Sequence, residues 1–115
     1  MVKQLDDCLS VTFGALADPT RREILAMLAE GEATVTELTA PFAISMPAIS
    51  RHLKVLEGAG LITRSRSGQH LTSSLRSAPL QEATEWMERY RQFWSASFDR
   101  LDAHLRQFQP GREGP

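Results

Sequence analysis

The chain has 115 residues, of which 42% are hydrophobic and 23% are charged, and its formal net charge is −1. These values are typical of one folded domain, which we expect at residues 1–109, with a disordered tail at 110–115 where Pro and Gly cluster. The N-terminus resembles no signal peptide, and no apolar run approaches the roughly 18 residues of a membrane span. The single cysteine, Cys8, cannot form an internal disulfide, so we expect a cytoplasmic protein.

The charge is unevenly distributed. Residues 1–44 carry a net charge of −4 and residues 77–115 a net charge of −1, whereas residues 45–76 carry +4. A basic segment in an acidic chain is a candidate binding surface for an anion, and nucleic acid is the first candidate. A solvated basic face without a partner is the alternative.

Two amphipathic helices are predicted at the start of the chain. Apolar residues at helical spacing predict the first from about Leu5 to Leu16. Asp18 is a suitable N-cap for the second, Pro19 fits its first turn, and Gly31 fits its end.

Two shorter helices, joined by a tight connection at residues 43–45, follow these. Thr36 is the predicted N-cap of the first, which Pro41 ends. Ser45 is the predicted N-cap of the second, and Pro47 lies in its first turn. The residues predicted to point into the core are Ile49, Leu53 and Leu56, and Gly58 and Gly60 are predicted to stop the helix.

This pair of helices predicts a helix-turn-helix, in which the second helix reads the DNA major groove. Arg51 suits a guanine edge or a phosphate, and Lys54 suits a phosphate. The predicted DNA contacts on this helix are Ser45, Pro47, Ser50, Arg51, His52 and Lys54.

A β-hairpin is predicted next, with one strand beginning at Leu61 and a second running from about His70 to Ser77. Gly68 lies at its turn, and we expect Arg64 to face solvent. The predicted DNA contacts of this wing are Arg64, Arg66, Gln69 and His70, which would lie along the backbone or reach into the minor groove. The predicted fold is therefore mainly α with a small β-hairpin, a winged helix-turn-helix.

One long helix is predicted from Pro79 to about Phe108, with an apolar seam that a small domain cannot cover alone. A second copy of the chain is the simplest partner, giving a homodimer through the first and last helices. The predicted interface residues are Leu5, Leu9, Met87, Tyr90, Trp94, Phe98, Leu101 and Leu105. Alternatively, the seam packs on the domain's own core, or the four aromatic residues Trp86, Tyr90, Phe93 and Trp94 line a pocket for a small-molecule effector.

Three stretches resemble the ArsR/SmtB family of bacterial winged-helix repressors: "ALADPTRREILAMLAEGEATVTEL", "PFAISMPAISRHLKVLEGAGLITRSRSGQ" and "FWSASFDRLDAHL". The resemblance covers about residues 10–105. It implies a homodimer that binds an inverted-repeat operator, often at its own promoter, and that an effector commonly releases from the DNA.

The sequence lacks the residues that form the metal sites of some family members. The stretch "TVTELTAPF" lacks the family's Cys-x-Cys, and Asp102 and His104 are followed by no second ligand pair. We therefore expect no metal and no cofactor. A lone cysteine on the first helix is usually a small core residue, so we expect Cys8 in the core. Redox sensing through an exposed Cys8 is the alternative.

No nucleophile elbow, phosphate loop or metal-hydrolase spacing is present, so we expect no enzymatic activity. The sequence favours a dimeric transcriptional repressor that binds double-stranded DNA, with no membrane association and with any effector unidentified. The alternative function is a winged-helix protein-interaction module that docks a partner through its long C-terminal helix.

Overall fold

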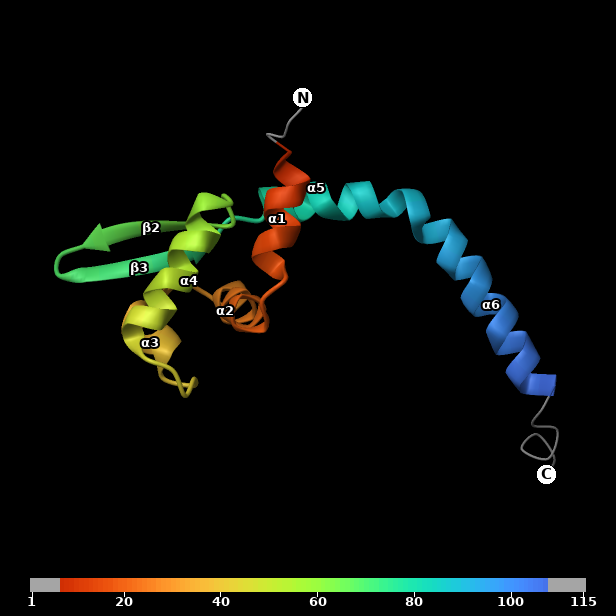
Figure 1. Ribbon diagram of the computed structural model, residues 1–115, viewed down its shortest axis with the longest axis horizontal. Helices are drawn as coiled ribbons and strands as arrows, with labels where there is room; N and C mark the ends of the chain where they lie inside the picture. The colour runs from red at the N-terminus through yellow and green to blue at the C-terminus, as the bar shows by residue number, and fades with distance from the viewer. Residues whose placement is uncertain (1–6, 108–115) are drawn as a thin grey trace. The chain divides into compact units, whose positions relative to one another are not determined.

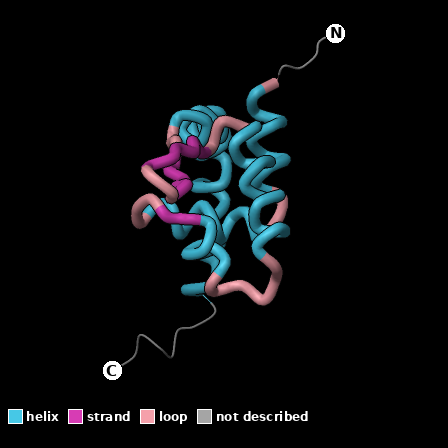
Figure 2. Tube along the Cα trace, turned by 90° about the vertical axis from the view of Figure 1, so that its left-hand side faces the viewer, coloured by secondary structure: helices cyan, strands magenta, loops and turns pink. Residues whose placement is uncertain are grey.

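The computed structural model describes residues 7–107 (Figure 1). Helices form most of this part of the chain, and strands form a smaller part (Figure 2). The strands make a small antiparallel sheet in the order β1-β3-β2. The chain divides into two compact units, residues 1–83 and 84–115. The elements in order are α1 (Cys8–Leu16), α2 (Pro19–Ala29), β1 (Ala33–Thr34), α3 (Val35–Thr39), α4 (Met46–Gly58), β2 (Ile62–Ser67), β3 (His70–Leu75), α5 (Ala78–Met87), a 3₁₀ turn (Glu88–Tyr90) and α6 (Arg91–Gln107).

The predicted starts of α2 and α4 are confirmed. The Asp18 carboxylate accepts a hydrogen bond from the backbone N–H of Arg21 at 3.1 Å and caps α2, with Pro19 in the first turn. The Ser45 hydroxyl accepts one from the backbone N–H of Ala48 at 3.3 Å and caps α4. These caps fix where the two helices begin.

The N-terminal helix differs from its prediction. Asp7 caps α1, so the helix begins at Cys8, and Leu5 lies outside the described residues. Thr12 and Ala15 are buried, whereas Val11 and Phe13 are exposed. Cys8 is exposed rather than in the core, so that expectation is wrong. The buried side of the helix therefore consists of small residues, and Leu16 at its end packs against the core.

The predicted cap of α3 is also wrong. Thr34, not Thr36, is the N-cap: its hydroxyl accepts from the backbone N–H of Glu37 at 3.1 Å, while the Glu37 carboxylate accepts from the backbone N–H of Thr34 at 2.8 Å. This reciprocal capping box satisfies two N–H groups, which a cap at Thr36 would not do.

The core of the first unit lies where α2, α3 and α4 meet the start of β2. Ile49, Leu53 and Leu56 of α4 are fully buried, as predicted. Leu61 and Ile62 are buried as well. Their other buried apolar neighbours are Ala15, Ile24, Leu25, Leu28 and Leu38. Packing of α4 against this cluster fixes which of its side chains face outward.

The predicted hairpin is present, with a third strand that was not expected. β2 and β3 pair from Ile62 opposite Leu75 to Ser67 opposite His70, and Gly68 takes a positive φ of 64° at the turn. The two-residue strand β1 pairs with β3, with Ala33 opposite Ser73. This third strand joins the middle of the hairpin to the segment that leads into α3.

The prediction of one long helix from Pro79 to Phe108 is wrong. α5 ends at Met87, a 3₁₀ turn follows, and α6 begins at Arg91. The rings of Trp86 and Tyr90 contact each other across the turn, with centroids 5.3 Å apart and planes tilted by 55°. Proline and glycine are the usual sequence signals for a break, and residues 80–109 contain neither.

Candidate DNA interface

The exposed side of α4 carries basic side chains. Because Ile49, Leu53 and Leu56 point inward, Arg51 and Lys54 are exposed, and Ser50 is half-buried beside them. Ser45 and Pro47 are exposed at the N-terminal end of the helix. α3 and α4, joined by residues 40–45, form the helix-turn-helix, and the N-terminal end of such a second helix contacts base edges in known complexes.

Two exposed apolar residues at the same end of α4 were not singled out from the sequence. Ile44 is 40% exposed and Met46 is 43% exposed. They surround the Ser45 cap and precede the basic residues of α4. Apolar side chains at this end of a reading helix suit the methyl group of thymine. The sequence does contain a signal for them: both residues precede Pro47, and neither belongs to the inward-pointing series that begins at Ile49.

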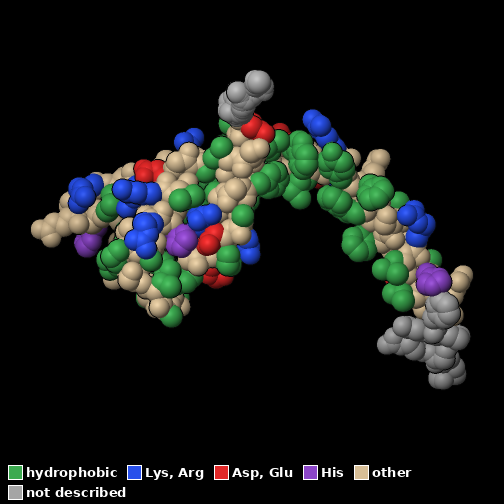
Figure 3. Space-filling view, in the orientation of Figure 1, with side chains coloured by type: hydrophobic (Ala, Val, Ile, Leu, Met, Phe, Trp, Pro, Cys, Tyr) green, Lys and Arg blue, Asp and Glu red, His purple; other side chains and the backbone are tan. Residues whose placement is uncertain are grey.

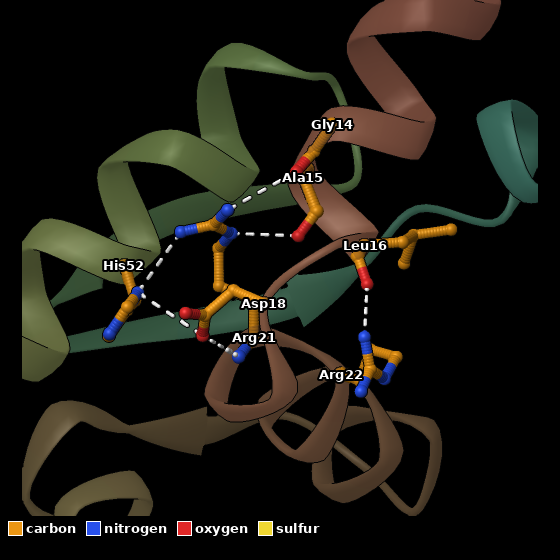
Figure 4. A network of polar contacts seen from close by, with 7 residues as sticks. All are labelled: Gly14, Ala15, Leu16, Asp18, Arg21, Arg22 and His52. Carbon is orange, nitrogen blue, oxygen red and sulfur yellow. Dashed lines mark hydrogen bonds and ion pairs between the residues drawn. The ribbon is translucent and has the colours of Figure 1, made fainter.

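His52 lies at the edge of α4 and contacts α2. Its Nδ1 lies 3.3 Å from Nη1 of Arg21 and 3.9 Å from the Asp18 carboxylate (Figure 4). The same Arg21 guanidinium donates from Nε to the carbonyl of Ala15 at 2.7 Å and from Nη2 to the carbonyl of Gly14 at 3.2 Å. Arg21 therefore connects the end of α1 to α4.

The pKa of Asp18 lies below its usual value. The largest cause is the hydrogen bond from the backbone N–H of Arg21, and desolvation opposes it. The nearby His52 and the Arg21 guanidinium lower the pKa further. The ionised carboxylate is thus the form that caps α2.

The tip of the hairpin is polar and accessible. Arg66, Gln69 and His70 are all exposed, on either side of Gly68. Figure 3 shows Lys and Arg side chains gathered over α4 and the β2–β3 hairpin. The structure therefore brings the basic residues of the reading helix and the wing into one unit.

Arg64 does not face solvent, so that expectation is wrong. Its side chain is 14% exposed, and Nη1 lies 3.8 Å from the Glu57 carboxylate on α4. Arg64 stands opposite Ser73 on β3, and Ser73 is fully buried. Ile62 and Arg64 are two residues apart in β2, so their side chains share the face that turns toward α4.

The second unit exposes a row of large apolar side chains. Of the predicted interface residues, Met87, Tyr90, Trp94, Phe98, Leu101 and Leu105 are 39–64% exposed, and Leu9 in α1 is half-buried. Phe93 is 72% exposed. Hydrophobic side chains follow the helix in Figure 3.

An open hollow of about 200 Å³ lies beside the 3₁₀ turn. Thr84, Met87, Glu88, Arg91 and Trp94 line it. Of the four aromatic residues expected to line an effector pocket, only Trp94 lies there among the described residues. The hollow is therefore not the aromatic pocket predicted from the sequence.

No group of three His, Cys, Asp or Glu side chains within residues 7–107 is arranged to hold a metal ion. Asp102 forms an ion pair with Arg106 one turn along α6. None of the helices in the same range has the length and apolar character needed to span a membrane.

Known proteins share this architecture. The family model of bacterial regulatory proteins of the arsR family matches residues 18–64, from the cap of α2 into β2. A transcriptional repressor of Bacillus subtilis, SdpR, is 43% identical over 75 residues, which cover 65% of this chain and 83% of that protein.

Two solved structures are similar over nearly their whole length. The crystal structure of an ArsR family transcriptional regulator has a TM-score of 0.71 and 34% identity, over 82% of this chain and 97% of that one. An ArsR-like transcriptional regulator from a Rhodococcus species has a TM-score of 0.65 and 29% identity, over 89% and 92% of the two chains.

The fold and these relatives, which are transcription regulators and not enzymes, identify a DNA-binding transcription regulator with a winged helix-turn-helix. The chain belongs to the ArsR family of bacterial regulators.

Proposed function

We propose that the protein is a homodimeric repressor that binds an inverted-repeat operator, with its own promoter as the first candidate. The observation that carries the proposal is the placement of Arg51 and Lys54 on the outer side of α4, in the same unit as the exposed wing residue Arg66. The relative SdpR is named a transcriptional repressor, which supports repression as the outcome of binding. A regulator of this kind works at the chromosome, in the cytoplasm.

In this proposal α4 enters the major groove and the wing follows the backbone. Arg51 reads a base and Lys54 contacts a phosphate, while the hydroxyls of Ser45 and Ser50 add short contacts. The remaining proposed DNA contacts are Pro47, His52, Arg66, Gln69 and His70. Arg64 acts differently: its ion pair with Glu57 braces the wing against α4.

Dimerisation is proposed to pair the exposed apolar faces of two chains. Trp94, Phe98, Leu101 and Leu105 recur at spacings of four, three and four, so they share one side of α6. Large exposed apolar patches mark interaction surfaces. A two-fold dimer would set two reading helices about one DNA turn, or roughly 34 Å, apart. The two-fold symmetry of such a dimer calls for an inverted repeat, and the spacing sets the distance between its half-sites.

The direct test is fluorescence anisotropy of the purified protein with a duplex from upstream of its own gene, beside a scrambled duplex, over a salt series. We expect tighter binding to the native duplex, weakening as salt rises because phosphate contacts release counterions. Equal, weak binding to both duplexes would count against this operator. A genome-wide recovery of bound DNA would then decide whether any operator exists.

The exposed apolar side of α6 also favours a second candidate, a module that docks a protein partner through this helix. The two functions predict different states of the isolated protein. A repressor closes this face with a second copy, whereas a docking module leaves the isolated chain monomeric. Sedimentation of the purified protein separates them.

A further inference from the structure

The Arg21 guanidinium joins three elements at one point. Nε and Nη2 donate to the last turn of α1, at the carbonyls of Ala15 and Gly14. Nη1 points at Nδ1 of His52 in α4, 3.3 Å away. Figure 4 shows that both contacts of the imidazole converge on this one ring nitrogen, while the other ring nitrogen points away from the cluster. The side chain of His52 is 22% exposed.

The distances separate the two neighbours of Nδ1: Nη1 of Arg21, at 3.3 Å, lies within hydrogen-bond distance, whereas the Asp18 carboxylate, at 3.9 Å, lies beyond it. A guanidinium stays protonated in proteins and has donors but no acceptor. When the imidazole is neutral, Nδ1 therefore accepts from Arg21 through its lone pair, and the single N–H of the ring lies on Nε2. Nε2 is the nitrogen directed away from Arg21 and Asp18, so His52 presents one hydrogen-bond donor outward.

The position of His52 on α4 suggests what this donor meets. Its side chain is partly exposed and contacts Arg21 of α2, so it lies at the border between the core side and the outer side of the helix. A helix seated in the major groove presents its outer side to the bases, and its borders face the walls of the groove. The walls are phosphate backbone, whose oxygens are strong acceptors.

We propose that Arg21 is a positioning residue that holds His52 with its proton on Nε2, and that His52 donates this hydrogen bond to a phosphate oxygen at the edge of the operator groove. The inference rests on the proposed function, because it needs α4 in the groove. It adds a residue outside the helix-turn-helix to the DNA-binding machinery. It also ties the end of α1 to the reading helix.

Arg22 supplies a matched control. It is the next residue of α2, and its guanidinium donates to the Leu16 carbonyl at 2.7 Å, so it binds the same end of α1 without contacting α4. We expect Arg21→Met to weaken binding to the upstream duplex about tenfold, the effect of losing one hydrogen bond to a charged acceptor. Arg22→Met should change it less than about twofold.

A double-mutant cycle tests whether Arg21 acts through His52. In a His52→Ala background, Arg21→Met should weaken binding less than about twofold, because the donor it positions is gone. Full additivity of the two substitutions would overturn the proposal, as would equal losses from Arg21→Met and Arg22→Met.

Two measurements on folded wild-type protein keep the proposal testable where Arg21→Met does not fold. Long-range ¹⁵N–¹H correlations of the imidazole rings, assigned with His52→Gln, should show the Nε2–H tautomer of His52. The duplex can also be scanned with neutral methylphosphonates, one phosphate at a time. One position per half-site should weaken binding of the wild-type protein and leave binding of His52→Ala unchanged. An Nδ1–H tautomer, or no such position, would overturn the proposal.

Different experimental results would refute the proposed function and the proposed phosphate contact. Wild-type protein that prefers no DNA sequence would refute the proposed function and the phosphate contact together. Wild-type protein that binds its operator while His52→Ala binds equally well would refute the contact alone.

Discussion

The exposed side of α6 makes a quantitative prediction about assembly. Phe98 is 64% exposed in the single chain. Full burial of a phenylalanine side chain contributes up to about 3 kcal/mol, so covering the exposed part of Phe98 contributes about 2 kcal/mol. A two-fold dimer covers two copies, about 4 kcal/mol in total, which corresponds to a change of about a thousandfold in the dissociation constant.

The perturbation is Phe98→Ala, which removes apolar area without adding charge. Because the side chain is mostly exposed in the single chain, its removal leaves no cavity in the folded monomer. Gln92→Ala is the control: Gln92 is exposed and precedes Leu101 by nine residues, or two and a half turns, so it lies on the opposite side of α6.

The assay is sedimentation equilibrium over a concentration series, with circular dichroism to confirm that helix content is retained. Wild type and Gln92→Ala should share one dimer dissociation constant, and Phe98→Ala should raise it about a thousandfold. A Phe98→Ala protein that dimerises like the control would refute the assignment of this side of α6 to the interface.

Three further predictions concern the first unit. Arg51→Ala should weaken binding to the operator by about 1 to 3 kcal/mol and relax the base preference. Arg66→Ala should weaken binding to all duplexes alike and reduce the dependence of the affinity on salt. Fluorescence anisotropy on the native and scrambled duplexes distinguishes these two results. Thr34→Ala removes the cap of α3 and should lower stability by about 1 kcal/mol in urea unfolding, while Thr34→Ser should not. The pKa of Asp18 is lowered in the folded state, so its carboxylate stabilises the fold above its usual pKa near 3.8, and this stability is lost as the pH falls through the lower folded value. Unfolding midpoints of Asp18→Asn should therefore change less with acid than those of wild type.

The helical core was predictable because its signals are local. Asp18 and Ser45 each stand directly before a proline-containing first turn, and the apolar spacing of Ile49, Leu53 and Leu56 follows the helical period. Such signals depend on neighbours within one or two turns. They identify the reading helix and its outward-facing residues without knowledge of the rest of the fold.

Two predictions were wrong although the sequence contains local signals for the observed structure. Thr34 and Glu37 have the three-residue spacing of a capping box, which outweighs a lone threonine at position 36. Ile62 and Arg64 are two apart in a strand, so the burial of one predicts that the other faces the same side. The cap follows from the residue types and their spacing, and the placement of Arg64 follows from the period of a strand.

Other features have no local signal. The two-residue strand β1 exists because Ala33 and Thr34 lie beside Ser73 and Thr72, about 40 residues away in the chain. The contact between Arg21 and His52 spans 31 residues. The break before α6 occurs without proline or glycine. Contacts between distant residues decide the first two features, and a single sequence does not encode their partners in any short pattern; within residues 7–107 the structure offers no long-range contact that explains the break.

Counting charges along the chain also does not show which basic side chains face solvent and which bind other groups of the protein. Arg21 and Arg22 lie in the acidic N-terminal segment, and their guanidinium groups donate to carbonyls at the end of α1. Arg64 lies in the basic segment but pairs with Glu57. Among the described residues of the first unit, the exposed lysine and arginines besides Arg22 are Arg51, Lys54, Arg66 and Arg76, and these four belong to the reading helix, the wing or its exit. The arginines bound to carbonyls and to Glu57 hold these elements in place, so the surface offered to DNA depends on residues that need not touch it.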